Sequence, residues 1–246
     1  MDALAVTLTV FAFLTSALSG MAGLGGGTIL IGIFFALGLT PVEAVPLFAA
    51  VQFVSNVSRT VAYVRHVHWA SAGWFLVAVI PATFLLAPHA ASVDGDVVRL
   101  ILAGLILASL VPARAGKAPL PPRASSLVAG LLNGSIGMFV GATGLIVGRL
   151  FLRPDWRKQT TIATLAMTQV LGHGLRVIAY GFVGYSAFAQ PWLLLPLCLA
   201  VIAGTWTGKH LNGRLSEERF ATLFHTILVI LSIKLIYDAM QGFGWI

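Results

Sequence analysis

The sequence predicts an all-α membrane protein: a polytopic bundle of transmembrane helices made of two inverted repeats, with short, glycine-broken segments. Hydrophobic residues make up 58% of the 246 residues and charged residues only 9%, whereas a soluble domain carries about 25% charged residues. The apolar runs are long and continuous rather than alternating, which favours helices over barrel strands in lipid. One long stretch of the chain also occurs twice, which indicates a duplicated architecture.

The repeated stretch begins with a glycine cluster and ends with a Gln-x6-Arg-x2-Ala-Tyr string. The first copy runs from Gly20 to Tyr63, and the second copy begins at Gly137 and aligns with it without a gap. The glycines and the string match in one frame, which indicates an internal duplication, and in a membrane protein such a duplication points to a transporter. The matched pairs include Gly20/Gly137, Met21/Met138, Gly27/Gly144, Gln52/Gln169, Arg59/Arg176 and Tyr63/Tyr180.

Apolar runs and the breakers between them define the expected helices in order. The first run ends at the glycine cluster, the second stops before Pro41, and the later runs are separated by charged or turn-forming gaps. In the first repeat, 1–112, helices are expected over 3–19, 28–39, 42–64, 70–87 and 97–111. A linker over 113–123 ends this repeat, because its prolines and charges cannot continue an apolar helix. In the second repeat, 124–246, helices are expected over 124–136, 145–152, 162–181, 191–206 and 220–240.

The segments beside the glycine clusters are short. As a helix, the run over 145–152 spans about 12 Å, against a hydrocarbon core of roughly 30 Å. Interrupted segments at matching places in two halves mark a transporter's binding site, because a half-helix N-terminus exposes N–H groups that favour an anion. Close helix packing through GxxxG pairs is the alternative use of these glycines. The candidate residues at the two breaks are Gly25, Gly26, Gly27, Gly141, Thr143 and Gly144.

A polar stripe follows each break. Its glutamine and arginine are spaced so that they share one helix face, and an arginine inside a membrane segment usually faces protein or water and marks a pathway. The alternatives are that the arginines snorkel to the interface, that the glutamines bond between helices, and that the histidine packs rather than carries a proton. The predicted stripe residues are Gln52, Asn56 and Arg59 in the first copy, and Gln169, His173 and Arg176 in the second.

Charge placement predicts the orientation of the chain. Four gaps are basic and one, with Asp94 and Asp96, is acidic. The positive-inside rule puts the basic gaps and the linker in the cytoplasm, with both chain ends outside. The gap before Val42 is then outside while its counterpart over 153–158 is inside, so the two repeats are inverted. The basic gaps carry Arg65, His66 and His68; Arg114, Lys117 and Arg123; Arg153, Arg157 and Lys158; and Lys209, Arg214 and Arg219.

Several other classes of function are not expected. The net charge of +7 lies mostly in short gaps between apolar runs, so the partners expected are the bilayer and a small anion rather than nucleic acid. The single cysteine, Cys198, allows neither a disulfide framework nor a cysteine metal site. No Walker A motif and no nucleophile with its base is present, and His66 and His68, although spaced like metal ligands, lie in a basic loop where an interfacial role is favoured. Neither a cofactor nor an enzyme is therefore expected. Glu43, the closest carboxylate candidate, is isolated.

At these residues the chain resembles the TauE/SafE family of membrane proteins, also known as the TSUP family. The resemblance rests on the Gly-Leu-Gly-Gly-Gly element at Gly23–Gly27, the Pro41-x2-Ala44 step and the repeat near Gly137, and it covers essentially the whole chain. It implies a secondary transporter, most simply an exporter, of small sulfur-containing anions such as sulfite, sulfonates or sulfoacetate across the cytoplasmic (inner) membrane. The alternatives are an anion channel or a non-transporting membrane subunit. The exact substrate, the direction of transport, the coupling ion and the oligomeric state are left open.

Overall fold

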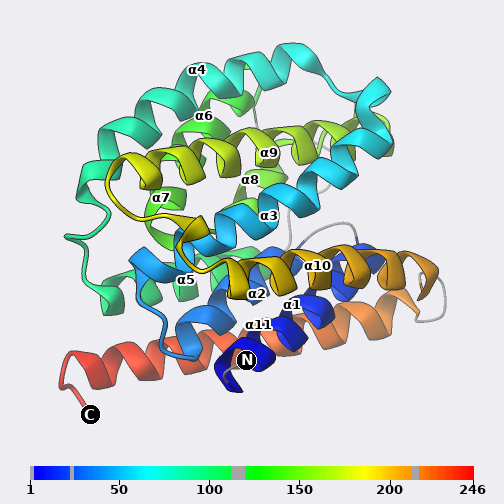
Figure 1. Cartoon of the computed structure of the whole chain (residues 1–246). Coiled ribbons are helices and arrows are strands. Elements are labelled where there is room, and N and C mark those ends of the chain that lie inside the picture. Colours follow the sequence, from blue (N-terminus) through cyan, green and yellow to red (C-terminus); the bar gives the residue numbers. More distant parts are fainter. Residues whose placement is uncertain (1–2, 23–24, 112–119, 212–215) are drawn as a thin grey trace.

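A computed structural model describes residues 3–22, 25–111, 120–211 and 216–246 (Figure 1). Every regular element within these ranges is a helix, and the helices form one bundle, which confirms the all-α class. The first half contains α1 (Ala3–Ala22), α2 (Gly26–Ala36), α3 (Pro41–Tyr63), η1 (Val64–His66), α4 (Trp69–Leu86), η2 (Ala87–His89) and α5 (Gly95–Leu110). The second half contains α6 (Pro122–Gly134), α7 (Ile136–Val140), α8 (Gly144–Leu150), α9 (Lys158–Phe182), η3 (Ala187–Ala189), α10 (Pro191–Leu211) and α11 (Glu217–Gly242).

The linker is shorter than the sequence suggested. Helix α6 begins at Pro122, so Pro122 and Arg123 belong to the helix and not to the linker. Proline suits the first position of a helix because its missing N–H would be unpaired there anyway. Arg114 and Lys117 of the linker and Arg214 of the fourth basic gap lie outside the described residues. The division into repeats at 1–112 and 124–246 stays a prediction.

Five described helices are long and apolar enough to cross a membrane, which makes this a multi-pass membrane protein. These spans are Ala3–Met21, Trp69–His89, Lys158–Phe182, Pro191–Leu211 and Glu218–Gly242. Helix α3 has 23 residues but carries Gln52, Asn56 and Arg59, and it is not among the five. Its start is fixed by a capping box, in which the backbone N–H of Thr40 donates to Glu43 Oε2 at 3.0 Å. The isolated carboxylate of Glu43 therefore has a structural role.

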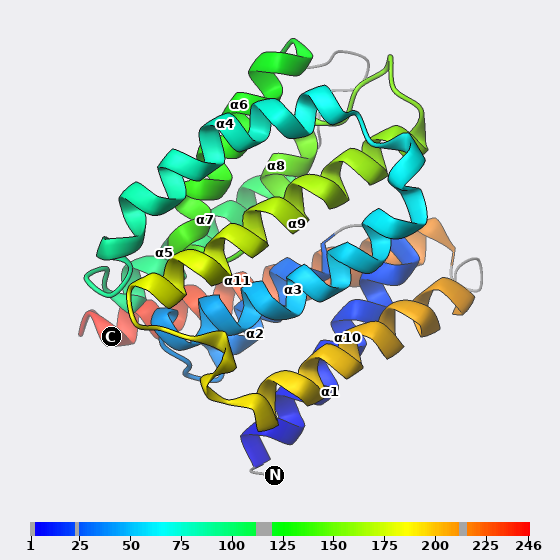
Figure 2. The ribbon, with the colours of Figure 1, turned by 45° about the horizontal axis from the view of Figure 1, so that its top comes forward.

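The helices pair as a pseudo-twofold arrangement requires. Helix α3 packs against α9 and α5 against α11, and the contact of α1 with α10 has its counterpart in the contact of α6 with α4. Equivalent helices run in opposite directions, as α3 and α9 show (Figures 1 and 2). The loop before α3 and the loop before α9 accordingly lie at opposite ends of the bundle. This geometry confirms the inverted relation of the two copies.

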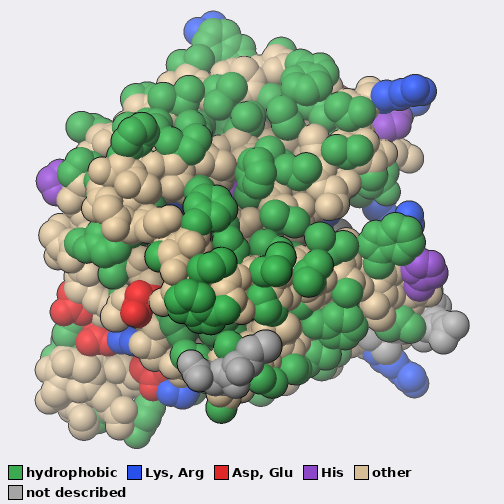
Figure 3. All heavy atoms as spheres, viewed as in Figure 1, with side chains coloured by type: hydrophobic (Ala, Val, Ile, Leu, Met, Phe, Trp, Pro, Cys, Tyr) green, Lys and Arg blue, Asp and Glu red, His purple; other side chains and the backbone are tan. Residues whose placement is uncertain are grey.

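The two ends of the bundle differ in charge. We define the basic face as the end where α3 and α10 finish and α4, α6, α9 and α11 begin, and the acidic face as the opposite end, where α1 begins and α11 finishes (Figure 2). Asp and Glu side chains gather at one end of the molecule, whereas Lys and Arg project from the other (Figure 3). The basic gaps therefore share one face, as the charge pattern predicted. Which face lies in the cytoplasm stays a prediction.

Small residues bring the outer helix pairs into close contact. A Cβ on Gly134 of α6 would lie 2.7 Å from the carbonyl oxygen of Val79 of α4, and a Cβ on Gly20 of α1 would lie 2.6 Å from that of Thr205 of α10. Glycine is needed at such approaches because any side chain would separate the backbones. Gly130 and Gly134, a GxxxG pair, therefore allow close packing of α6 against α4. They are separate from the glycines of the two breaks.

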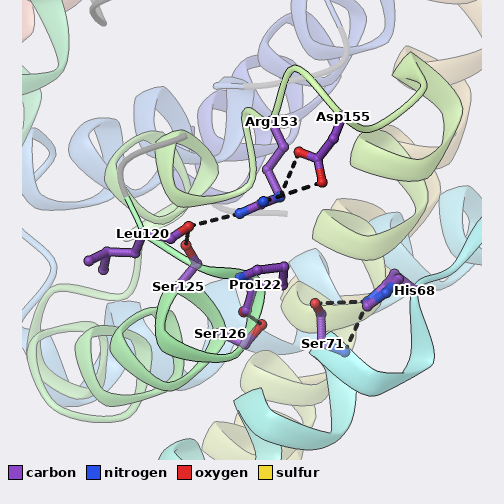
Figure 4. A network of polar contacts seen from close by, with 8 residues as sticks. All are labelled: His68, Ser71, Leu120, Pro122, Ser125, Ser126, Arg153 and Asp155. Atoms are coloured by element: carbon purple, nitrogen blue, oxygen red, sulfur yellow. Dashed lines mark hydrogen bonds and ion pairs between the residues drawn. The ribbon is translucent and has the colours of Figure 1, made fainter. Parts of the chain in front are cut away.

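Polar contacts on the basic face tie the loop before α9 to the start of α6 (Figure 4). Arg153 Nη1 donates to the carbonyl oxygen of Leu120 at 2.8 Å, and Arg153 Nε lies 3.0 Å from Asp155 Oδ1. In the same region, the His68 side chain caps α4, because its Nδ1 accepts from the backbone N–H of Ser71 at 3.3 Å. The basic gap residues Arg153 and His68 therefore order the loops of this face.

Candidate functional site

A cavity of about 70 Å³ lies among α1, α2, α3, α8 and α9. A single water needs roughly 10–15 Å³, so the cavity has room for a few waters or one small ion. Among the described residues that line it, none is an Asp or Glu. They are Ser19, Gly25, Gly27, Thr28, Phe48, Gln52, Asn56, Arg59, Ala142, Gly144, Leu145, Thr161, Ile162, Leu165, Ala166, Gln169 and His173.

The first glycine break places the N-terminus of α2 at this cavity. Gly25, with φ of 95°, is the N-cap of α2 and offers no side chain to the helix. The N–H groups of Thr28 and Ile29 bond back to the carbonyl oxygen of Gly25, whereas the N–H groups of Gly26 and Gly27 are too early in the helix to find an intrahelical acceptor. Such a terminus attracts an anion through its free N–H groups and its partial positive charge.

Arg59 brings a positive charge to the same cavity. Its single described hydrogen bond is a long one, from Nη2 to Ser19 Oγ at 3.4 Å. The ion pairs among the described residues join Arg99 with Asp96, Arg153 with Asp155 and Lys234 with Asp238, and none involves Arg59. The guanidinium group has five N–H donors, so most of its capacity is available to a ligand.

The two glutamines of the stripes differ in what they contact. Gln52 lies against the backbone of Gly27, where a Cβ would be 2.8 Å from Gln52 Nε2. Gln169 is only 8% exposed, and its Nε2 has no hydrogen-bond partner in the described part of the chain. A buried amide without a partner costs about 1–3 kcal/mol, so a ligand that accepted from Gln169 would remove this cost. Gly144 has no atom within 4 Å of its Cβ position and leaves this side of the cavity open.

Arg176, the counterpart of Arg59, lies behind the cavity wall and is 1% exposed. Its Nη1 donates to the carbonyl oxygen of Gly141 at 2.9 Å, and its Nη2 to the carbonyl oxygen of Asn133 at 2.9 Å. Gly137 makes room for the guanidinium, because a Cβ there would lie 2.5 Å from Nη2. Thr143 Oγ1 accepts from Asn133 Nδ2 at 3.1 Å and joins the same cluster. Arg176 thus holds together the second break, which α6, α7 and α8 form.

His173 lies between Arg176 and the cavity. Arg176 Nη1 lies 3.0 Å from its Nδ1, and the ring packs edge-on against Phe48, with centroids 5.5 Å apart. An arginine can only donate, so Nδ1 accepts and the proton of the neutral imidazole sits on Nε2. His173 therefore offers the cavity an N–H donor.

Eight of the twelve predicted site residues line the cavity and four do not. Those in the lining are Gly25, Gly27, Gln52, Asn56, Arg59, Gly144, Gln169 and His173, and those behind it are Gly26, Gly141, Thr143 and Arg176. The sequence reasoning did not single out Ser19, Phe48, Thr161 or Leu165. The sequence spacing could have identified two of them. Thr161 and Leu165 lie four residues apart and extend the helix face of Gln169 and His173 by two turns.

The cavity opens towards the basic face. Ser19, Arg59 and Thr161, near the ends of α1 and α3 and the start of α9, are partly exposed. Phe48 and His173, deeper along α3 and α9, are 1% and 3% exposed. The described residues therefore show a mouth on the basic face and a packed wall towards the acidic face.

Inverted repeats around a central polar cavity, with broken helices at its wall, define a secondary-transporter fold. The family model described as "Sulfite exporter TauE/SafE" matches residues 8–235 of the chain. The chain therefore belongs to the TauE/SafE family of membrane transporters. A search of the curated proteins and a search of the solved structures each found no match.

Proposed function

We propose that the protein is a secondary transporter that exports small sulfur-containing anions, such as sulfite, sulfonates or sulfoacetate, across the cytoplasmic membrane. The observation that carries the proposal is the position of Arg59. Its guanidinium shares a cavity of about 70 Å³ with the N-terminus of α2, and the part of the lining that the structure describes contains no carboxylate. A positive charge in such a site has no counter-ion among the described lining residues, and an anion would supply one.

The donors around the cavity suit an oxyanion with several acceptor oxygens. Arg59 offers a fork of N–H groups, Gln169 an unpartnered amide, His173 an Nε2–H and Gly27 a backbone N–H. Sulfite and sulfonate groups each present three oxygens at nearby corners of a pyramid or tetrahedron, so they can accept from several of these donors at once. Apolar Phe48, Leu145 and Leu165 close the remaining walls and limit the size of the attached group.

Export follows from the charge of the two faces. If the basic face lies in the cytoplasm, the mouth of the cavity faces the cytoplasmic pool of anions. The inside-negative membrane potential then assists outward movement by about 2.3 kcal/mol per charge per 100 mV. An anion gradient and this potential are sufficient to drive export without ATP.

An anion channel is the second candidate. A channel needs a continuous path when open, whereas here the side towards the acidic face is packed by Phe48 and by the Arg176 cluster. This packing favours a carrier that exposes its site to one face at a time. In proteoliposomes, saturable flux that is accelerated by unlabelled anion on the opposite side supports the carrier, whereas linear flux without countertransport supports the channel.

Binding of anions to the purified protein tests the proposal. The melting midpoint, followed by tryptophan fluorescence in detergent, rises by mass action when a ligand binds the folded form. We expect a rise with sulfite or sulfoacetate, and a smaller one or none with acetate, which has only two oxygens, and with taurine, whose ammonium group would lie in a positively charged cavity. Arg59→Gln should abolish the rise, and Arg157→Gln, an exposed arginine outside the cavity, should preserve it. A rise that survives Arg59→Gln unchanged overturns the site.

A further inference from the structure

The cavity lies across the pseudo-twofold relation of the two repeats. Twelve of its lining residues are equivalent to one another in the gap-free alignment of the two copies. The pairs are Gly25/Ala142, Gly27/Gly144, Thr28/Leu145, Phe48/Leu165, Gln52/Gln169 and Asn56/His173. Both repeats therefore contribute equivalent positions to one shared site.

The remaining five lining residues break this symmetry, and all of them except the buried Ala166 are partly exposed at the mouth on the basic face. They are Ser19, Arg59, Thr161, Ile162 and Ala166, whose counterparts are Ile136, Arg176, Ala44, Val45 and Ala49. None of these counterparts lines the cavity, and four of them are fully buried: Ala44, Val45 and Ala49 are 0% exposed and Arg176 is 1% exposed. Equivalent residues of the two repeats thus have different arrangements: one set lines an opening on the basic face, and the other set is closed on the side of the acidic face.

Resting on the proposed transport of anions, we propose that the protein has a second conformation in which this asymmetry is reversed. The cavity then opens to the acidic face between Ala44, Val45 and Ala49, and Arg176 becomes the arginine that contacts the anion. Arg59 withdraws behind the cavity wall in its own repeat, in the position equivalent to the one that Arg176 has now. The anion is handed from one arginine to the other as the site changes sides.

Side chains in the first copy can replace part of the hydrogen bonding that Arg176 loses in the exchange. Arg176 is now held by the carbonyl oxygens of Gly141 and Asn133 and by the side chains of Asn133 and His173. The residues equivalent to Asn133 and His173 in the first copy are Ser16 and Asn56. Both are polar and buried, and each offers a side-chain oxygen that can accept from Arg59. Ser16 and Asn56 can therefore replace the side-chain contacts that Arg176 loses on release, which offsets part of the free-energy cost of the exchange between the two conformations.

Cysteine accessibility tests the second opening. In a Cys198→Ala background, Thr161→Cys and Ala44→Cys are treated in spheroplasts and in inverted vesicles with a cationic, membrane-impermeant methanethiosulfonate. We expect Thr161→Cys to react only from the basic side and Ala44→Cys only from the acidic side, more slowly, because a minor conformation is populated at roughly 0.1–10%. Ala103→Cys, equally buried in α5, is the control and should stay unmodified. An unreactive Ala44→Cys beside a reactive Thr161→Cys overturns the proposal.

Protection by an anion tests the exchange of the arginines. Sulfoacetate is the probe, because sulfite itself attacks thiosulfonates. Arg59→Gln should remove protection at Thr161→Cys and keep it at Ala44→Cys, whereas Arg176→Gln should do the reverse. Loss of protection at both positions in Arg176→Gln, repeated in Arg176→Lys, shows a purely structural arginine and overturns the exchange.

The two failures can be told apart. If sulfoacetate protects Thr161→Cys but Ala44→Cys never reacts, the binding site stands and the second conformation does not. If Thr161→Cys reacts and sulfoacetate, sulfite and the other anions neither protect it nor raise the melting midpoint, the proposed function itself fails.

Discussion

Arg176 holds Nδ1 of His173 at 3.0 Å from its Nη1, and this contact decides what the histidine can do. A guanidinium has no acceptor, so a proton on Nδ1 would remove the hydrogen bond and place two cations side by side within the membrane. The histidine is therefore kept neutral, with its N–H directed away from the arginine. It acts as a hydrogen-bond donor at the cavity rather than as a proton carrier.

Anion binding should be insensitive to pH across the range in which a free histidine titrates. Between about pH 6 and pH 8, the affinity for methanesulfonate, whose charge is constant over this range, should stay flat. Titration calorimetry at several pH values measures it, with His173→Gln as the comparison. Affinity that rises as the pH falls, and loses this dependence in His173→Gln, would show that the histidine does take up a proton with the anion.

Arg176→Ala should destabilise the protein much more than Arg59→Ala. The first removes the donor for two buried carbonyl oxygens, those of Gly141 and Asn133, and each buried acceptor left alone costs about 1–3 kcal/mol. The second removes one long contact to Ser19. We expect the melting midpoint of Arg176→Ala to fall by roughly 5–10 °C, with little change for Arg59→Ala. Equal shifts of the melting midpoint in the two variants would contradict the role of Arg176 in holding Gly141 and Asn133 together.

Two glycines of the second break should respond differently to alanine. A Cβ on Gly137 would lie 2.5 Å from Arg176 Nη2, whereas the Cβ position of Gly144 meets nothing within 4 Å. Gly137→Ala should therefore lower the melting midpoint, and Gly144→Ala should leave it unchanged while weakening binding of the larger sulfonates. Gly181→Ala, also with nothing within 4 Å and outside the cavity, is the control for both measurements. A stable Gly137→Ala would mean that Arg176 can move aside freely.

Much of the architecture followed from the sequence because its signals are local. Long apolar runs gave the helices, and the matched frame of Arg59 and Arg176 gave the duplication. The basic gap before α9 belongs on the inside, whereas counting spans from the basic gaps puts the uncharged gap before α3 outside, and this predicted the inversion. The end of the linker was misplaced because Pro122 can either end one segment or start the next.

The difference between the two arginines could not be predicted in this way. Arg59 and Arg176 occupy the same place in the two copies, followed in each by Ala and Tyr, so the sequence assigns them one role. Their surroundings differ because α1 continues to Ala22, whereas its counterpart is divided into α6 and α7 at Ser135. That division brings the carbonyl oxygen of Asn133 to Arg176, and only the packed structure shows it.

The orientation of the bundle is the last prediction, and two exposed residues test it. In a Cys198→Ala background, Ser92→Cys lies in the loop before α5 on the acidic face and His66→Cys lies in η1 on the basic face. Lys and Arg concentrate on the cytoplasmic side of membrane proteins because they resist translocation. We therefore expect an impermeant maleimide to label Ser92→Cys in spheroplasts and His66→Cys in inverted vesicles only. The opposite pattern would leave the inverted repeats intact, but it would turn the mouth of the cavity outward and replace export by uptake.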